Sequence, residues 1–411
     1  MVMQEVKKNP RVVMYSHDTM GLGHFRRNLL IANELSKSSV FPNILLISGA
    51  REAEYFSLPQ NVECLTLPSL FKEKDGQYRS RRLNMSLSQI VELRKKILHS
   101  AITSFEPEVL IVDGVPWGVE GELIPTLAHL NADKNTRCIF GIRDVWDEPG
   151  VIKKEWNKRN NFDAIRRYYD QVWIYGDKSV YDPVYEYSLS EEIKEKVRFT
   201  GYLYQKPRLG LMTFRDQLAV KEILKTIDGP FVLCLLGSGQ DGDNLAKAFI
   251  NSKLPPGHKG VILTGPHMNP ISRELLFRQA EKNPRMIIIE FCNEPTAILQ
   301  KATCVVAMGG YNTICEILSF RKKALIVPRV MPRKEQLIRA SRLQSKGYLD
   351  VLRPDKLDSH SLSKWFESNQ KQIPNYEFKM TGLSTISNLF TNILYEMSQS
   401  PWTYPRRNSF E

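Results

Sequence analysis

Residues 14–35, "MYSHDTMGLGHFRRNLLIANEL", hold the first group of side chains that could do chemistry. Titratable residues and glycines stand together where an apolar run gives way to a helical pattern: His17, Asp18, Gly21, Gly23 and His24. A neutral histidine beside a closely approaching backbone can take a proton from a hydroxyl near neutral pH. The pattern departs from the dinucleotide fingerprint, because Arg26 stands where the third glycine would be. A tight turn in which His24 only caps or packs explains the same residues.

The stretch "CVVAMGGYNTICEI" predicts a strand, a Gly-Gly turn and a helix. Glycines let the chain approach a phosphate, and the free amides of a helix start can hold a diphosphate. Glu316, one turn into this helix, can accept hydrogen bonds from both hydroxyls of a ribose. The alternative is a capping box of Thr313 and Glu316, which occurs at many helix starts.

In "VPRVMPRKEQLIRASRL", a basic loop leads from a strand to Glu335 and Gln336 at the start of a helix. A carboxylate and an amide at such an edge suit sugar hydroxyls, which need directional hydrogen bonds. An ordinary solvated helix face explains the same residues.

In "CLLGSGQDGDNLAKAF", the turn formed by Gly237, Ser238 and Gly239 is followed by Asp241 and Asp243. An Asp-x-Asp pair binds metal in one class of sugar-transferring enzymes. We expect these aspartates instead to cap and charge the first turn of a helix, so no metal site is predicted.

Strand and helix signals alternate along the chain and must position these loops. The first series of short apolar runs extends from "RVVMYS" to "VRFTG", and the second from "FVLCLLG" to "ALIVPRV". Helical patterns lie between several of these runs, and within the first series residues 87–105 carry an apolar stripe of helical period. This βα alternation predicts an α/β protein with two doubly wound, Rossmann-like parallel sheets, whose ligands bind beyond the carboxyl ends of the strands.

A chain of 411 residues suits two domains, and we expect them at residues 1–204 and 205–375, with a final helix and tail at 376–411 that could cross back to the first domain. The sequence lacks an apolar run near the ~18 residues of a membrane span, and its start lacks a secretory signal, so a cytoplasmic location is expected. The six cysteines are scattered without a C-x-x-C pair and are expected to be buried thiols.

The net charge of +12 lies mostly in the second half. Residues 1–200 hold 28 Lys and Arg against 27 Asp and Glu, and residues 201–411 hold 29 against 18. Basic runs lie at 79–96 and 153–169, and the second contains aromatics. They lack a recognised nucleic-acid-binding module, so no nucleic-acid partner is expected. They suit anionic lipid head groups at the inner face of a membrane.

These stretches, in this order on two α/β halves, resemble the GT-B glycosyltransferases and within them family 28, which includes the peptidoglycan N-acetylglucosaminyltransferase MurG. "YSHDTMGLGHFRR" is more similar to a bacterial branch of predicted glycosyltransferases than to the peptidoglycan enzyme. The resemblance implies two Rossmann-like domains facing a central cleft, with the acceptor on the N-terminal half and the nucleotide sugar on the C-terminal half.

The resemblance also implies roles for particular residues. The turn and ribose-binding glutamate of the family are matched by Gly309, Gly310, Tyr311, Asn312, Thr313 and Glu316. The uracil-recognising segment resembles Phe291 and Cys292 in "EFCNEP", and the turn at 237–239 resembles a loop near the diphosphate and sugar. Glu335 and Gln336 resemble the donor-sugar readers, although Glu335 replaces a glutamine of the peptidoglycan enzyme. The acceptor loop, with Gly21 and Gly23, leaves the base open among His24, His17 and Asp18.

The sequence therefore predicts a hexosyltransferase that moves a sugar from a nucleoside diphosphate, UDP by preference, to an acceptor hydroxyl. The reaction is expected to be inverting and independent of metals, with the UDP-sugar as co-substrate and no further cofactor. A UDP-sugar 2-epimerase and a non-catalytic nucleotide-sugar-binding subunit remain the alternatives.

Overall fold

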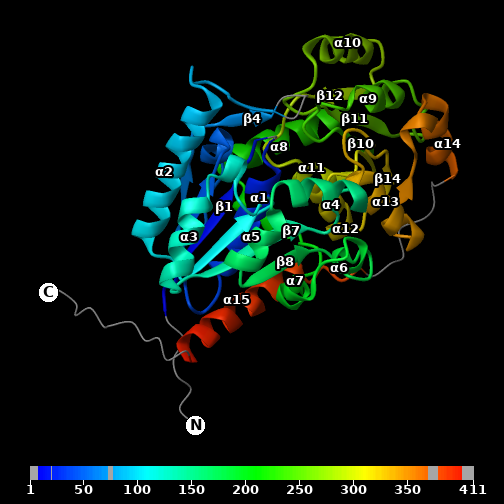
Figure 1. Ribbon diagram of the computed structural model, residues 1–411. Helices are drawn as coiled ribbons and strands as arrows, with labels where there is room; N and C mark the ends of the chain where they lie inside the picture. The colour runs from blue at the N-terminus through cyan, green and yellow to red at the C-terminus, as the bar shows by residue number, and fades with distance from the viewer. Residues whose placement is uncertain (1–7, 20, 73–76, 369–377, 400–411) are drawn as a thin grey trace.

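Two α/β lobes lie side by side in a computed structural model, which describes residues 8–19, 21–72, 77–368 and 378–399 (Figure 1). Each lobe is built on a parallel sheet covered by helices, as the alternation of apolar runs predicts.

The sheet of the N-terminal lobe has seven parallel strands within the described residues, in the order β3-β2-β1-β6-β7-β8-β9. The strand order reverses between β1 and β6, where Ser16 lies beside Asp113 in register. The strands are β1 (Arg11–Ser16), β2 (Asn43–Ser48), β3 (Val62–Thr66), β6 (Val109–Asp113), β7 (Arg137–Arg143), β8 (Gln171–Tyr175) and β9 (Val197–Phe199). A small antiparallel hairpin of β4 (Leu70–Lys72) and β5 (Tyr78–Ser80) lies apart from this sheet and was not predicted.

Helices cover this sheet on both faces. The apolar stripe at 87–105 forms a helix with the predicted bounds, and Ser86 and Gln89 complete a capping box at its start. The helices are α1 (Gly23–Leu35), α2 (Leu87–Phe105), α3 (Ile124–Asp133), α4 (Pro149–Lys158), α5 (Asn161–Tyr168), α6 (Pro183–Glu186) and α7 (Glu191–Lys196), with short 3₁₀ turns η1 (Arg51–Tyr55) and η2 (Val119–Gly121).

The C-terminal lobe repeats this design with six parallel strands in its described part, ordered β12-β11-β10-β13-β14-β15. Here the order reverses between β10 and β13. The strands are β10 (Phe231–Leu235), β11 (Lys259–Leu263), β12 (Met286–Ile289), β13 (Cys304–Ala307), β14 (Lys323–Ile326) and β15 (Asp350–Val351). The helical elements are η3 (Lys206–Leu211), α8 (Phe214–Ile227), α9 (Asp243–Ile250), α10 (Pro270–Glu281), α11 (Pro295–Lys301), α12 (Tyr311–Ser319), α13 (Glu335–Ser345), η4 (Pro354–Lys356) and α14 (Ser359–Ser368).

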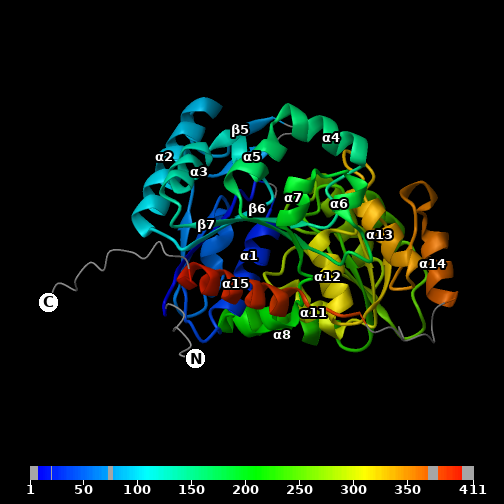
Figure 2. The same ribbon diagram turned by 60° about the horizontal axis from the view of Figure 1, so that its bottom comes forward.

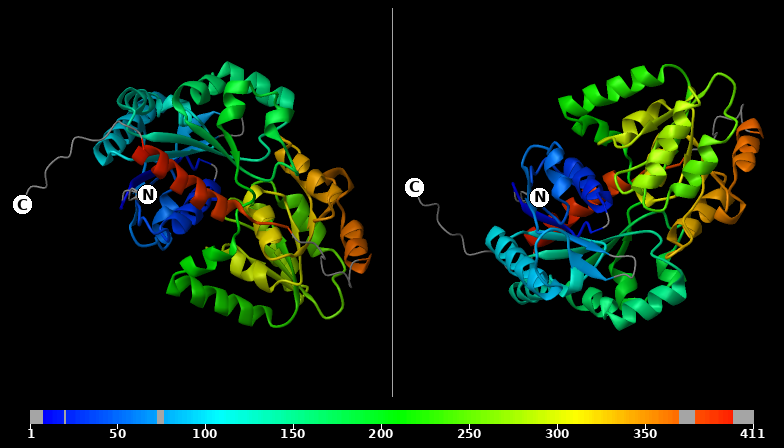
Figure 3. Two further views of the ribbon diagram at one scale, coloured as in Figure 1. Left: turned by 90° about the horizontal axis from the view of Figure 1, so that it is seen from below. Right: turned by 90° about the horizontal axis from the view of Figure 1, so that it is seen from above.

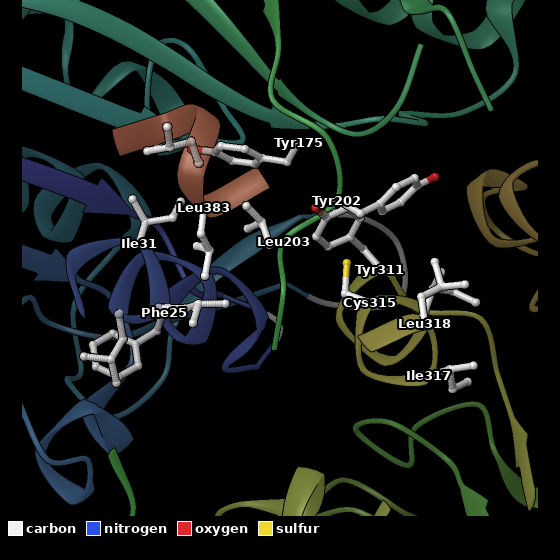
Figure 4. Close-up of a cluster of buried hydrophobic side chains, with 14 of the residues drawn as sticks. Phe25, Ile31, Tyr175, Tyr202, Leu203, Tyr311, Cys315, Ile317, Leu318 and Leu383 are labelled. Atoms are coloured by element: carbon white, nitrogen blue, oxygen red, sulfur yellow. The ribbon is translucent and has the colours of Figure 1, made fainter. Parts of the chain in front are cut away.

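The final helix, α15 (Gly382–Gln399), leaves the second lobe and packs against α1 of the first (Figures 2 and 3). Buried side chains continue from one lobe to the other at this point, with Tyr202, Leu203 and Leu383 between α1 and α12 (Figure 4). This apolar contact holds the lobes together on the side away from the β4–β5 hairpin.

The expected domain bounds near 204 and 375 remain predictions, and residues 376–377 and 400–411 of the expected final segment lie outside the described residues. All six cysteines are free thiols, and five are buried. None of the helices in the described part of the chain combines the length and apolar character needed to cross a bilayer.

Candidate active site

A cleft of about 520 Å³ lies between the two lobes, at the carboxyl ends of their central strands. In doubly wound sheets, loops diverge where the strand order reverses, and ligands bind in the resulting crevice. The loops after β1 and β6 of one lobe and after β10 and β13 of the other leave their sheets at these two reversals. The predicted loops therefore come together from distant parts of the sequence.

Most of the predicted residues line this cleft. From the first lobe these are Asp18, Gly21 and Gly23, and from the second Gly237, Ser238, Phe291, Cys292, Gly310, Asn312, Thr313, Glu316 and Gln336.

Six predicted residues are not among those that line the cleft: His17, His24, Gly239, Gly309, Tyr311 and Glu335. The His24 side chain is 22% exposed. Gly239 has a φ of +90°, and a Cβ on it would approach the backbone oxygen of Thr264 to 2.3 Å, so it shapes the turn. The Tyr311 ring is buried, with the guanidinium carbons of Arg27 and Arg339 at 5.5 and 5.6 Å from its centroid.

The start of α12 opens on the cleft. Its N-cap residue is Gly310, which has no side chain and therefore caps none of the first amides. Thr313 is the third residue of the helix, so the alternative of a Thr313–Glu316 capping box at the helix start is wrong. The amides and the positive end of the helix dipole are directed where an anion could bind.

Glu316 lies one turn further into α12 and is held by a buried arginine from η3. Arg208 Nη1 donates to Glu316 Oε1 at 2.6 Å, and its Nη2 donates to Glu294 Oε1 at 2.9 Å. Burial raises the pKa of Glu316, and the charge of Arg208 opposes this rise. Arg208, which is itself held by Glu294, thus orients the Glu316 carboxylate at the cleft wall.

Asp18 occupies the start of α1. It accepts hydrogen bonds from the backbone N–H of Phe25 at 2.9 Å and from the hydroxyls of Ser16 and Ser48. Burial raises its pKa, against the effect of the His24 charge and these hydrogen bonds. Asp18 thus satisfies one amide in the first turn of α1, although it also lines the cleft.

His24 is positioned by Asp113, a residue that the sequence analysis missed. Nδ1 of His24 lies 3.1 Å from Asp113 Oδ2 and 2.8 Å from Arg27 Nη2. The ring packs on Gly114, where a Cβ would come within 2.7 Å of Cε1. Because a neutral imidazole has one donor nitrogen, Nδ1 either donates to Asp113 or accepts from Arg27. Only donation to Asp113 leaves the Nε2 lone pair available to a proton.

The same aspartate forms a buried ion pair with Arg27, whose Nη2 lies 2.6 Å from Asp113 Oδ2. Burial alone would raise the pKa of Asp113, but the charges of Arg27 and His24 lower it below its ordinary value. Asp113 therefore stays ionised and can orient His24.

At the sugar end predicted from the sequence, Glu335 does not reach the cleft. Its Oε1 pairs with Arg329 Nη2 at 2.9 Å, and Arg329 also pairs with Asp241 at 3.2 Å. Gln336 lines the cleft but its Oε1 accepts from the backbone N–H of Arg329. Asp243 lies in the first turn of α9, as predicted, but the expected cap is wrong, because the N-cap is Gly242 and no side chain caps it. Within the described residues, no group of three or more His, Cys, Asp or Glu could hold a metal ion.

A second set of contacts joins the lobes outside the cleft. Arg339 of α13 forms a fully buried ion pair with Asp144, with 2.7 Å between Nη2 and Oδ1. Arg333 pairs with Glu155 at 2.8 Å and Lys334 with Glu148 at 2.9 Å. All three cations come from the second lobe, which carries most of the net charge.

Three further residues at or beside the cleft escaped the sequence analysis: Arg26, Arg208 and Arg329. Arg26 was noted only as the residue that interrupts the glycine pattern. Arg208 lies in an irregular basic stretch between the two series of strands, and only the folded chain brings it to Glu316.

Two facing Rossmann-like lobes with a cleft between their strand ends define the GT-B class of fold. Residues 258–389 match the model of the glycosyltransferase family 28 C-terminal domain. This match confirms the resemblance to family 28 over the part of the chain that carries α12 and α13.

Two curated relatives are UDP-N-acetylglucosamine–N-acetylmuramyl-(pentapeptide) pyrophosphoryl-undecaprenol N-acetylglucosamine transferases. The one from Streptococcus mutans is 34% identical over 101 residues, and the one from Clostridium botulinum is 29% identical over 107. The matched segments span 24% and 25% of this chain, and only 28% and 30% of the relatives' own length.

Solved structures with the same fold include transferases and epimerases. The UDP-GlcNAc 2-epimerase from Neisseria meningitidis bound to UDP-GlcNAc overlays with a TM-score of 0.63 at 15% identity, covering 94% of this chain and 100% of that chain. A UDP-glucose: anthocyanidin 3-O-glucosyltransferase in complex with UDP overlays with a TM-score of 0.60 at 12% identity, covering 96% of each. At these identities the overlays establish the GT-B fold alone.

Proposed function

We propose that the protein transfers a sugar from a nucleoside diphosphate, UDP by preference, to an acceptor hydroxyl with inversion at the anomeric carbon. The observation that carries this proposal is the start of α12, whose uncapped amides open on the cleft opposite the acceptor loop. Glu316 lies one turn below these amides, where it can accept from a ribose. The names of the curated relatives, which include a UDP-sugar and a sugar transfer, support this choice.

In the proposed reaction the acceptor oxygen bonds to the anomeric carbon while the bond from that carbon to the diphosphate breaks. The hydroxyl proton passes to Nε2 of His24, with Asp113 holding Nδ1. The amides of α12 and Arg329, which lines the cleft, would stabilise the departing diphosphate, so no metal is required. His17, whose ring centroid lies 4.7 Å from that of His24, and Asp18 are the alternative bases.

A thermal-shift screen with UDP-, GDP- and dTDP-sugars tests the donor site. A ligand that binds only the folded state stabilises it by mass action, so UDP-sugars should raise the Tm most. If none of the three nucleotide classes shifts the Tm, the proposed donor site is wrong.

The overlay with a 2-epimerase at a TM-score of 0.63 favours a second candidate function. The two are separated by incubating the protein with UDP-GlcNAc and no acceptor, followed by NMR of the sugar. Interconversion at C2 identifies an epimerase, whereas slow hydrolysis or unchanged donor supports the transferase.

We further propose a lipid-linked acceptor and contact with an anionic membrane at its inner face, since the relatives' names include an undecaprenol acceptor. On α4, the exposed side chains of Lys153, Lys154 and Lys158 stand beside an exposed Val151. Pelleting with anionic vesicles should occur at low salt and decrease as salt is raised. Equal pelleting with neutral vesicles would contradict this proposal.

A further inference from the structure

Arg26 belongs to the acceptor lobe but reaches the donor side of the cleft. It lies in the first turns of α1, and its Nη2 donates to the backbone oxygen of Asn293 at 2.7 Å. Close by, Asn312 Nδ2 at the start of α12 donates to the backbone oxygen of Gly23 at 2.9 Å. The start of α1 is therefore bonded to both segments that are proposed to hold the nucleotide.

The charge of Arg26 is unmatched. Arg208 takes both nearby carboxylates, Glu294 and Glu316. Among the described residues Arg26 forms no ion pair, and its Nε is buried without a hydrogen-bond partner. Burial and the charge of Arg208 lower the pKa of Arg26, and the two carboxylates oppose this.

An unpaired charge at Arg26 would lower the stability of the fold if the residue had only a structural role. Arg26 is half-buried, and its Nε is fully buried. A cation so far removed from water normally has a bonded anion, because its desolvation is otherwise uncompensated. Packing alone would be served by an apolar side chain over the Phe56 ring, which the guanidinium carbon approaches to 5.7 Å from the centroid. An anionic ligand in the cleft would supply both the missing charge and acceptor atoms for the remaining guanidinium donors.

We propose that Arg26 is a donor-binding residue supplied by the acceptor lobe, which donates hydrogen bonds to the nucleoside of a UDP donor between Asn293 and Glu316. This inference rests on the proposed function. A bound donor is then contacted by both lobes, so its binding holds them together.

The test measures the affinities of UDP and uridine for the full chain by calorimetry. Arg26→Met should weaken both about 10- to 100-fold, the range for loss of a charged hydrogen bond. Arg26→Lys keeps the charge without the planar donors and should fall between. Arg342→Met is the matched control, because Arg342 makes an exposed ion pair with Glu186 between the lobes at 2.7 Å, outside the cleft. It should bind both ligands like the unaltered chain.

The outcomes distinguish failure of the proposed function from failure of the Arg26 proposal. If the unaltered chain binds neither ligand, the proposed function fails. If it binds them and Arg26→Met binds equally well, or loses only UDP, the nucleoside contact of Arg26 is overturned. Should Arg26→Met fail to fold, hydrogen exchange of the unaltered chain decides: UDP should slow exchange at residues 24–29 of α1, and an unchanged rate there would refute the proposal.

Discussion

The two lobes each place a helix start after a glycine-containing loop at the centre of the sheet, yet the two starts are occupied differently. At α1, Asp18 accepts from the Phe25 amide and His24 is bonded to Asp113. At α12, Gly310 leaves the first amides open to the cleft. At α1 a side chain of the protein accepts from an amide of the first turn, whereas at α12 the N-cap residue offers no side chain to the amides.

This difference indicates that the two helix starts have different roles. At the start of α1, hydrogen bonds within the protein fix the orientation of titratable groups, as a proton transfer needs. An uncapped start keeps its binding capacity for an anion. The following predictions test whether the starts differ in function as they do in structure.

The largest effect is expected at His24. His24→Ala should lower kcat for sugar transfer, or for donor hydrolysis with water as acceptor, about 1,000-fold, because the proposed base is lost. The donor KM should change little, because His24 belongs to the acceptor lobe and is not one of the residues that line the cleft. The matched variant His17→Ala should keep most of the activity. If His17→Ala loses activity and His24→Ala does not, the base is His17.

Asp113→Asn should destabilise the protein by about 3 kcal/mol at neutral pH, because Arg27 loses its buried partner. Since the pKa of Asp113 is lowered in the folded state, its contribution is complete above pH about 4 and is lost as the pH falls through the lowered pKa. Denaturant unfolding of both proteins across this range should show a stability difference that shrinks with acid. The exposed control Asp133→Asn should show no such trend, and a constant difference for Asp113→Asn would contradict the ion-pair assignment.

Glu316→Ala should raise the donor KM about 100-fold, because an oriented carboxylate that accepts from the ribose is removed. Glu316→Gln retains one acceptor oxygen and should have a smaller effect. The control is Glu290→Ala, which removes an exposed partner of Arg273 outside the cleft. An unchanged donor KM for Glu316→Ala, measured with a protein of normal Tm, would remove the ribose assignment.

Local patterns predicted most of the fold. The apolar runs correspond to the strands of both sheets, and the helix at 87–105 has its predicted bounds because its stripe and its Ser86 cap agree. The β4–β5 hairpin escaped prediction because its strands are only three residues long. Short strands carry too few alternating positions to be distinguished from a loop.

Site residues were predicted when they belong to a recognisable loop. Residues that reach the site from a distant part of the sequence were missed. Glu316 follows its glycines at a spacing that the sequence displays. Arg208 reaches it from 108 positions away, and Asp113 reaches His24 from 89. These pairs depend on strand order, which a single sequence does not display.

The last prediction concerns the uncapped start itself, where stability and binding should change in opposite directions. Gly310 has a φ of −60°, and a Cβ on it would meet nothing within 4 Å, so a side chain fits without strain. Gly310→Asp should stabilise the fold by a few tenths of a kcal/mol, because aspartate caps a helix slightly better than glycine and suits its dipole. The same carboxylate would occupy the amides and repel a diphosphate, so UDP affinity should fall about 10-fold. Gly310→Asn offers the cap without the charge and should weaken UDP less. If Gly310→Asp binds UDP normally, the amides of α12 do not hold the diphosphate, and the contrast between the two helix starts has no functional meaning.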